Sequence, residues 1–333
     1  MTETYAKMNN LCLVVLAGVA TTAALIFTRS ILVPFVISIF IYALLSPVLQ
    51  WQQSTLRLPR VLAILLTALV FLLLAAIIFY LVSSSLSSFM LSADVYRDKI
   101  VALVQELGQF AGQWGIKLDS TAIQGALDKI PVLTMAQNIT GSAISFVGNT
   151  MLVVVFVLFL ITGDGSQQQP NRLFLEIQNN VSRYVATKFL VSLATGILVG
   201  AILGGFGVEL ALMLAVLTVL LNFIPTIGSL IATLLPVPVL LLQFGLAWQT
   251  AVVLGLLAAI QFMIGSVLEP KVMGESLDLH PVTILLFLMF WGLVWGFAGM
   301  FLAVPITAIL KIILSRLEQT KPVAELLAGR LPA

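Results

Sequence analysis

Several long stretches of this chain contain no Asp, Glu, Lys or Arg, and they restrict its fold more than any other feature. They are residues 30–56, 61–93, 130–163, 189–208, 210–268 and 281–310. A helix that spans a bilayer needs about 20 apolar residues, because roughly 30 Å of hydrocarbon is crossed at roughly 1.5 Å per residue. Lipid cannot hydrogen-bond the backbone, which favours helices, and the run from Met151 to Leu160 lacks the alternation of a barrel strand. We therefore expect an all-α, polytopic integral membrane helical bundle.

The composition excludes several other classes of protein. The 333 residues are 60% hydrophobic and 9% charged, whereas soluble domains carry about 25% charged residues. A net charge of +2 provides no basic field for nucleic acid, so no nucleic-acid partner is expected. The single cysteine, Cys12, excludes an intramolecular disulfide and most thiolate metal sites. We expect no cofactor, no metal and no catalytic residue.

The polar breaks between the apolar stretches predict the order of segments. Short loops rich in Lys and Arg stay in the cytoplasm, and the loop with Arg57 and Arg60 contains no acidic residue. Both termini are therefore expected in the cytoplasm. The predicted segments are three membrane spans in 1–82, a small extracytoplasmic helical insert in 83–142, a fourth span in 143–163, a cytoplasmic interfacial amphipathic helix in 164–188, a C-terminal membrane region with Asn-Pro-Gly and Glu-Pro motifs in 189–314, and a cytoplasmic tail in 315–333.

Three junctions carry more specific expectations. The first two spans meet at Arg29–Ser30 and are expected to form a tight antiparallel hairpin. Lys188, at the end of the amphipathic segment, is expected to face lipid headgroups. Residues 282–314 would form a helix of about 50 Å if unbroken, or a hairpin if the chain turns at the cluster Trp291–Gly296. With one long helix here we expect eight spans in total.

Glycines four residues apart mark a helix-packing surface in the fifth span, about 189–207. Gly196, Gly200 and Gly204 share one helical face, and their lack of a side chain lets another backbone approach closely. The partner helix could belong to the same chain or to another copy.

The segment from Asn222 to Gly228 interrupts the apolar stretch 210–268. Pro225 removes a backbone hydrogen bond and disfavours helix at the residue before it, and Gly228 loosens the chain three residues later. Such breaks in transporters present helix ends and free carbonyl groups to a solute or ion near the middle of the membrane. We expect a broken helix and a solute pathway here, with an ordinary proline kink as the alternative.

Charged residues next to the apolar stretches are further pathway candidates. Glu269 begins the motif Glu269-Pro270-Lys271-Val-Met-Gly274, and Glu209 stands alone between two apolar runs. A charge in the middle of a bilayer is costly and therefore marks function, but at the boundary a long side chain reaches water. Glu269 and Glu209 are thus either ion-binding or proton-exchanging carboxylates, or boundary residues.

These C-terminal motifs resemble those of the autoinducer-2 exporter family of prokaryotic membrane transporters, formerly grouped as uncharacterised permeases. The resemblance covers nearly the whole chain and includes Asn222–Gly228, Glu269–Gly274, Phe290–Met300, Leu302–Pro305, Val33–Phe35 and Ser46–Pro47. It implies a multi-pass protein of the cytoplasmic (inner) membrane with about eight spans and both termini cytoplasmic. Some members are linked to export of the quorum-sensing signal autoinducer-2 and others to sodium/proton antiport. A homo-oligomer is consistent with the resemblance.

The function expected from these features is secondary transport, not catalysis. The chain lacks the phosphate-binding loop G-x-x-x-x-G-K-[ST], so an ion or solute gradient would supply the energy. We expect an exporter of a small polar solute, such as autoinducer-2 or a related metabolite, with the lipid bilayer as its other partner. One alternative is a sodium/proton-type antiporter, in which Glu269 or Glu209 exchanges a proton for a monovalent cation. Another is a passive channel or a membrane scaffold.

Overall fold

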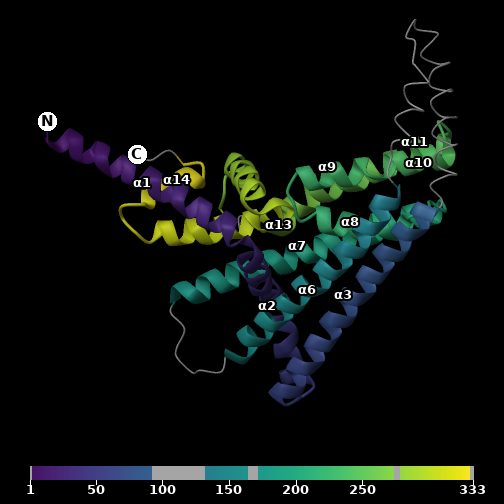
Figure 1. Ribbon diagram of the computed structural model, residues 1–333, viewed down its shortest axis with the longest axis horizontal. Coiled ribbons are helices and arrows are strands. Elements are labelled where there is room, and N and C mark those ends of the chain that lie inside the picture. Colours follow the sequence, from purple (N-terminus) through teal and green to yellow (C-terminus); the bar gives the residue numbers. More distant parts are fainter. Residues whose placement is uncertain (1, 92–131, 164–171, 274–277, 331–333) are drawn as a thin grey trace, which may run out of the picture. The chain divides into compact units, whose positions relative to one another are not determined.

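The computed structural model describes residues 2–91, 132–163, 172–273 and 278–330, which form helices and turns and contain no strand (Figure 1). This confirms the predicted all-α class. The elements are α1 (Thr2–Phe27), α2 (Arg29–Thr55), α3 (Arg60–Leu91), α6 (Val132–Gly163), α7 (Arg172–Gly205), α8 (Ala211–Leu221), α9 (Ile227–Leu234), α10 (Pro236–Phe244), α11 (Trp248–Phe262), the π-helix η1 (Met263–Leu268), α12 (Glu269–Met273), α13 (Pro281–Ser315) and α14 (Lys321–Leu327).

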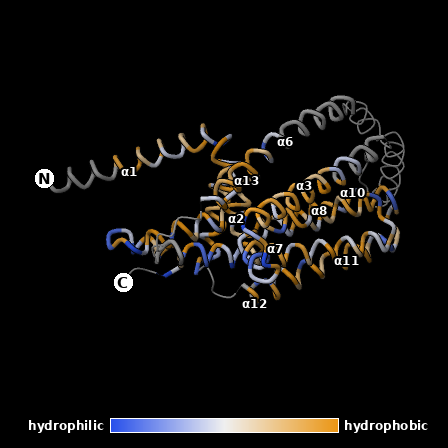
Figure 2. Tube along the Cα trace, turned by 90° about the horizontal axis from the view of Figure 1, so that it is seen from below, coloured by the Kyte–Doolittle hydropathy of each residue, from blue (hydrophilic) through white to orange (hydrophobic). Residues whose placement is uncertain are grey.

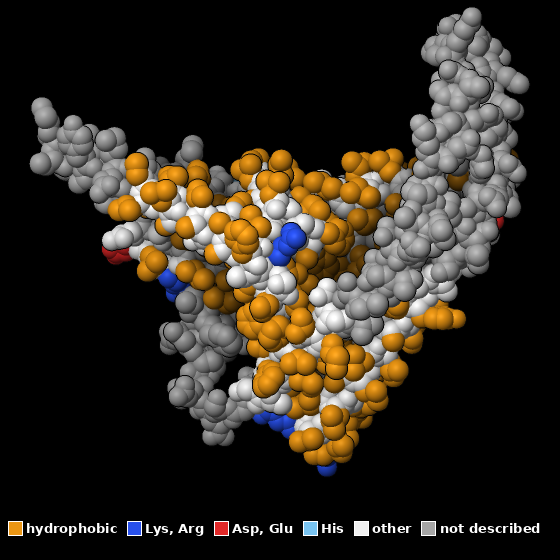
Figure 3. All heavy atoms as spheres, viewed as in Figure 1, with side chains coloured by type: hydrophobic (Ala, Val, Ile, Leu, Met, Phe, Trp, Pro, Cys, Tyr) orange, Lys and Arg blue, Asp and Glu red, His pale blue; other side chains and the backbone are white. Residues whose placement is uncertain are grey.

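The described helices have the length and the surface of a multi-pass membrane protein. Six are long and apolar enough to cross a membrane: Arg29–Thr55, Arg60–Leu81, Glu176–Gly205, Ile227–Phe244, Trp248–Leu268 and Pro281–Ser315. Three shorter apolar helices accompany them, at Cys12–Phe27, Gly148–Gly163 and Ala211–Leu221. Large hydrophobic side chains are exposed on these helices, including Phe159 (72%) and Leu293 (85%). Figure 2 shows that most of the described helical residues are hydrophobic, and Figure 3 shows hydrophobic side chains over much of one face. An apolar surface of this extent is stable against lipid and not against water.

Two predicted segments need separate comment: one lies mostly outside the described residues, and the other has a different boundary in the structure. Most of the predicted insert 83–142 lies outside the described residues, although α3 continues to Leu91 and α6 begins at Val132. The interfacial helix predicted up to residue 188 and the following span form one continuous helix, α7. No proline or other helix breaker occurs at the expected boundary, so the hydrogen-bonded backbone continues through it.

The chain forms two compact units, each with its own apolar core. The first comprises residues 1–65, 149–185 and 275–333, and the second comprises residues 66–148 and 186–274. The first core consists of Leu49, Ala63, Ile64, Val153, Val157 and Ile161. The second consists of Val199, Leu203, Val208, Leu214, Val239, Leu240, Val253 and Leu257.

The junction between α1 and α2 is a bend and not the antiparallel hairpin that we expected. Thr28 has φ −92° and ψ 5°, close to helical values. Its N–H donates to the Ala24 carbonyl (2.9 Å), and its own carbonyl accepts from the N–H of Leu32 (3.0 Å). Because helical hydrogen bonds are made on both sides of Thr28, the chain direction bends there without reversing.

The last long apolar segment, in contrast, folds back on itself. Within α13 the backbone of Gly296 leaves helical geometry, with φ 64° and ψ −141°. Lys311 Nζ donates to Asp278 Oδ2 at 2.6 Å, although a straight helix would separate the two ends of α13 by about 50 Å. The expectation of one long final helix was therefore wrong, and the hairpin alternative holds. Glycine is required at the turn, since φ in this range strains other residues.

Close contact between the two arms of this hairpin also depends on a glycine. A Cβ placed on Gly299 would overlap the backbone carbonyl of Trp291. At the tip, Trp295 Nε1 donates to the carbonyl of Leu25 in α1 (3.1 Å). This bond satisfies an indole N–H in an apolar environment and connects the hairpin to the bend after α1.

The glycine surface of α7 faces a helix of the same chain. A Cβ on Gly196 would overlap the side chain of Val219 in α8, and one on Gly200 would lie 3.0 Å from the Cβ of Ala215. A Cβ on Gly204 would have no atom within 4 Å. Two of the three glycines therefore allow α7 and α8 to approach closely, and the third lies in open space.

The predicted break between Asn222 and Gly228 is confirmed. Helix α8 ends at Leu221, and α9 begins at Ile227. Between them Thr226 has φ 59°, which costs a β-branched residue roughly 1–3 kcal/mol. A Cβ on Gly228 would overlap the carbonyl oxygen of Leu221, so only glycine lets the start of α9 fold against the end of α8.

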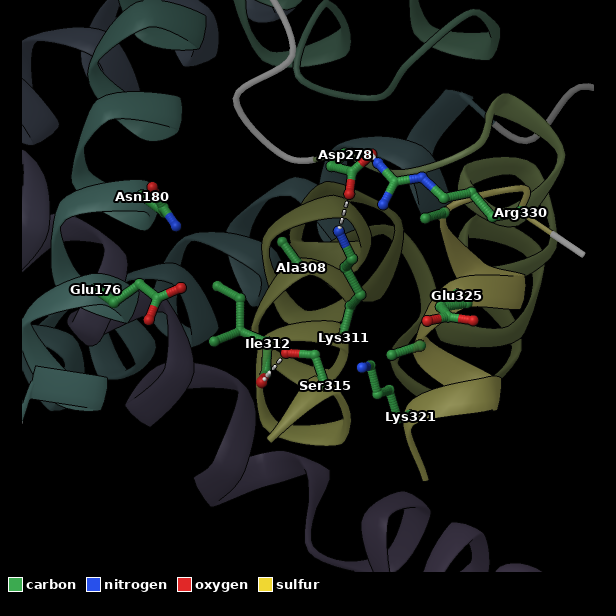
Figure 4. Close-up of a pocket in the computed structure, with 12 residues that line it drawn as sticks. Glu176, Asn180, Asp278, Ala308, Lys311, Ile312, Ser315, Lys321, Glu325 and Arg330 are labelled. Atoms are coloured by element: carbon green, nitrogen blue, oxygen red, sulfur yellow. Dashed lines mark hydrogen bonds and ion pairs between the residues drawn. The ribbon is translucent and has the colours of Figure 1, made fainter. Parts of the chain in front are cut away.

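Helix α14 docks on the open end of the α13 hairpin through Asp278. The carboxylate accepts from Lys311 Nζ (2.6 Å) and from Arg330 Nη2 (2.8 Å). The N–H of His280 donates to the carbonyl of Leu327 at the end of α14 (3.0 Å). Figure 4 shows Lys311 and Arg330 reaching Asp278 beside a cavity of about 290 Å³.

Replacing Gly228 by Ala is expected to destabilise the chain by about 1–3 kcal/mol, because the new methyl group forces the α8–α9 turn apart. The matched control is Gly204→Ala, which adds a methyl group in open space and favours helix by up to about 1 kcal/mol. The measurement is the thermal unfolding midpoint of each purified variant in detergent. Equal midpoints for the two variants would contradict the tight α8–α9 contact.

Replacing Asp278 by Asn is expected to loosen α14 without unfolding the chain. Partly exposed ion pairs contribute about 0.2–1 kcal/mol each, and Asp278 makes two of them. Trypsin should therefore cleave the tail roughly two to thirty times faster. Limited proteolysis with mass spectrometry measures the rate. The matched control is Glu318→Gln, which removes an exposed acidic side chain between α13 and α14. Trypsin should cleave this variant at the original rate. Indistinguishable rates for the two variants would show that Asp278 does not hold α14.

Candidate functional site

One face of α7 carries three buried polar residues. Lys188, Ser192 and Thr195 are spaced by four and three residues, so they lie one above another on the same helical face. Lys188 is 1% exposed, and Ser192 and Thr195 are fully buried. The expectation that Lys188 faces lipid headgroups was therefore wrong. Its charge does not need to reach water, because an acidic side chain lies beside it inside the protein.

That acidic side chain is Glu269, the first residue of α12. The ammonium group of Lys188 donates to Glu269 Oε1, and the carboxylate of Glu269 is 19% exposed. Removing a charge from water costs several kcal/mol, and a partner of opposite sign offsets that cost only when the two groups are in direct contact. The pair is thus neutral as a whole, while each member depends on the other.

Asn222 reaches the same face of α7 from the broken helix. It is 3% exposed, and its Nδ2 lies 3.4 Å from both Ser192 Oγ and Thr195 Oγ1. It can point inward because α8 ends there: its own N–H closes the last helical turn on Thr218, and the chain then leaves helical geometry at Thr226. These long hydrogen bonds are weaker than bonds near 2.9 Å.

The structure therefore brings together two motifs that are 47 residues apart in the sequence, at Asn222 and Glu269. Lys188, Ser192 and Thr195 connect them. We call these five residues the α7 polar site. Sequence reasoning missed Ser192 and Thr195, and it assigned Lys188 elsewhere. The signal that could have found them is the helical spacing of three polar residues at the start of an otherwise apolar span.

A π-helix precedes Glu269 and affects where its side chain points. Segment η1 covers Met263–Leu268, between α11 and α12. A π-helix takes an extra residue per turn and leaves weaker backbone bonding, and short π segments occur frequently at functional sites. Glu269 thus begins α12 directly after an irregular turn of a long apolar helix.

The other predicted pathway residues lie outside the polar site. Glu209 is exposed, and its N–H donates to Gln243 Oε1 (2.9 Å). Lys271 is exposed on α12. Pro270 is part of the same short helix, and Pro225 lies in the α8–α9 turn, where its carbonyl accepts from Ile227 (2.6 Å). Gly274 lies outside the described residues.

The chemistry that this site offers is hydrogen bonding and charge. It provides one ammonium group, one carboxylate, one amide and two hydroxyl groups in an apolar surrounding. Within the part of the chain that the structure describes, no group of three or more His, Cys, Asp or Glu residues could hold a metal ion. These groups can donate to and accept from a small polar molecule or an ion.

Comparison with known proteins identifies the family. A protein of Escherichia coli (strain K12) named AI-2 transport protein TqsA is 28% identical over 341 residues, covering 98% of each chain. A second relative comes from Haemophilus influenzae, and its name describes transport as an assumed role. It is 29% identical, and the match covers 95% of this chain and 93% of the relative's length. A similarly named Mycobacterium tuberculosis protein is 30% identical, with coverage of 84% and 80%. The model of the AI-2E family of transporters matches residues 15–319. This chain belongs to the AI-2E transporter family.

Proposed function

We propose that this chain is a secondary transporter that exports a small polar solute, such as autoinducer-2 or a related metabolite, through the α7 polar site. The observation that carries the proposal is the buried pair of Lys188 and Glu269 beside the amide of Asn222. Ionisable residues inside a membrane protein are costly and cluster on solute and ion pathways. Membership of a transporter family supports the same conclusion.

The proposed mechanism uses the irregular segments that border the site. The turn between α8 and α9 and the π-helix η1 both interrupt regular helical hydrogen bonding. Short segments of this kind can shift with little loss of regular bonding, which suits a site that opens to each side of the membrane in turn. The solute would exchange hydrogen bonds with Asn222 and with the two hydroxyl groups of α7.

We further propose that both termini lie in the cytoplasm of a prokaryotic cell, at its inner membrane. Arg57 in the short loop before α3 and Arg60, the first residue of α3, support this orientation, since positive residues are retained inside. Arg60 Nη2 donates to the carbonyl of Ile161 (2.9 Å), which joins the start of α3 to the end of α6. Lys311, Arg316, Lys321 and Arg330 near the C-terminus add further positive charge.

A second candidate is a monovalent cation/proton antiporter. The observation in its favour is the partly buried carboxylate of Glu269, which could exchange a proton for a cation if Lys188 moved aside. Glu209 contributes less to this candidate, because its side chain is exposed. The ammonium group of Lys188 beside the carboxylate disfavours a bare cation, so we rank this function second.

The test uses the purified chain in sealed proteoliposomes loaded with autoinducer-2. Solute loss that depends on the protein, and that an imposed proton or sodium gradient can drive uphill, would support the proposed transporter. An internal pH change that requires sodium and proceeds without solute would instead support the antiporter. Downhill flux that no gradient can reverse would identify a channel, and absence of any flux would contradict all three.

Charge removal at the ion pair tests whether it belongs to the site. Lys188→Met and Glu269→Gln should each lower stability by about 3–5 kcal/mol, because each leaves a buried charge without its partner. The double variant should recover most of that loss but should still transport at least about tenfold more slowly. Lys321→Met, at an exposed lysine of α14, is the matched control for both measurements. A double variant with the original transport rate would show that the pair is only structural.

A further inference from the structure

Gln261, near the end of α11, is a buried amide without a partner. The residue as a whole is only 7% exposed. Neither Oε1 nor Nε2 makes a hydrogen bond to any described part of the chain. Burying an amide without partners costs the protein free energy, so each such group calls for an explanation.

The neighbours of Gln261 on α11 show which way its side chain points. Leu257 precedes it by four residues, so the two side chains lie on the same helical face. Val253 and Leu257 are fully buried in the core that includes Val199 and Leu203 of α7. Gln261 therefore continues the face that α11 turns toward that core.

Two neighbours locate Gln261. Helix α11 continues without interruption through η1 into α12, so Gln261 lies about two helical turns before Glu269, which pairs with Lys188. Helix α11 also packs against α9 and α10, and the turn at Gly245 makes it run antiparallel to them. The end of α11 that carries Gln261 therefore lies toward the start of α9, where the broken segment after Asn222 ends.

The π-helix brings the two polar groups of this face into line. Gln261 and Glu269 are eight residues apart. In a regular α-helix, eight residues make slightly more than two full turns, so the two side chains would point about 80° apart around the helix axis. The wider winding of η1, between Gln261 and Glu269, absorbs much of that angle. Gln261 and Glu269 are thus directed to nearly the same side of this continuous helix.

We infer that Gln261 is a specificity-determining residue of the solute site, and that it binds a neutral solute carrying a hydrogen-bond donor and an acceptor close together, such as a hydroxy-carbonyl compound or a polyol. This inference rests on the proposed transport function. An amide donates through Nε2 and accepts through Oε1, which matches such a solute. A bare cation would satisfy only the oxygen and would meet the ammonium group of Lys188. The neutral ion pair likewise leaves no net charge to attract an ion.

The test replaces Gln261 by Met, which keeps the length of the side chain and removes both polar groups. Two neutral hydrogen bonds to the solute would be lost, so the half-saturation concentration for autoinducer-2 in proteoliposomes should rise roughly tenfold. The thermal midpoint without solute should stay equal or rise, because an unsatisfied buried amide is removed. A merely structural glutamine would give the opposite change in the midpoint.

Gln243→Met is the matched control. The amide of Gln243 is satisfied, since it accepts from the N–H of Glu209 (2.9 Å) and donates to the carbonyl of Gly207 (2.7 Å). This variant should therefore lower the midpoint and leave the half-saturation concentration unchanged. Xylitol and sodium, supplied separately as competitors, report the class of solute. Xylitol should compete in the original chain and more weakly in Gln261→Met, and sodium should not compete in either.

The outcomes separate this inference from the proposed function. Transport of autoinducer-2 with an unchanged half-saturation concentration in Gln261→Met would overturn the inference and leave the transporter proposal intact. A lowered midpoint in Gln261→Met, or competition by sodium that depends on Gln261, would also overturn it. Absence of protein-dependent transport in the original chain would overturn both.

Discussion

The ion pair between Lys188 and Glu269 is the interaction on which the candidate site depends. Each charge alone would be costly in the apolar interior of a membrane protein, and direct contact makes both tolerable. The pair connects the middle of α7 to the start of α12, and α7 in turn supports Asn222 through Ser192 and Thr195. Separating the charges would therefore disturb every group of the site together.

Side chains satisfy backbone groups at two of the described helix ends. Thr250 Oγ1 donates to the carbonyl of Gly245 after α10 (2.9 Å), and His280 Nδ1 accepts from the N–H of Val282 at the start of α13 (3.3 Å). Lipid provides no hydrogen bonds, so breaks in membrane helices persist only where protein groups replace them. The same requirement makes the unpartnered amide of Gln261 informative, because a solute can supply what the protein does not.

The two compact units differ in what they offer to function. The first contains the folded-back hairpin of α13 and the charged contacts of Asp278, and these contacts are mutually paired and lie toward the exposed end of α14. The second contains the buried polar residues next to a broken helix and a π-helix. Polar groups held inside an apolar unit, beside segments that can shift, are the combination expected of a transport site.

The sequence by itself determined the membrane character, the all-α class and the break after Asn222. Each follows from local chemistry: uncharged stretches require lipid, and the proline after Asn222 removes a backbone hydrogen bond and disfavours helix at the residue before it. Only the tertiary structure decided that α13 folds back at Gly296, that Thr28 is a bend, and that Lys188 pairs with Glu269. Those outcomes depend on contacts between residues distant in the sequence. A helical pattern shows which residues share a face, but not which other helix that face will meet.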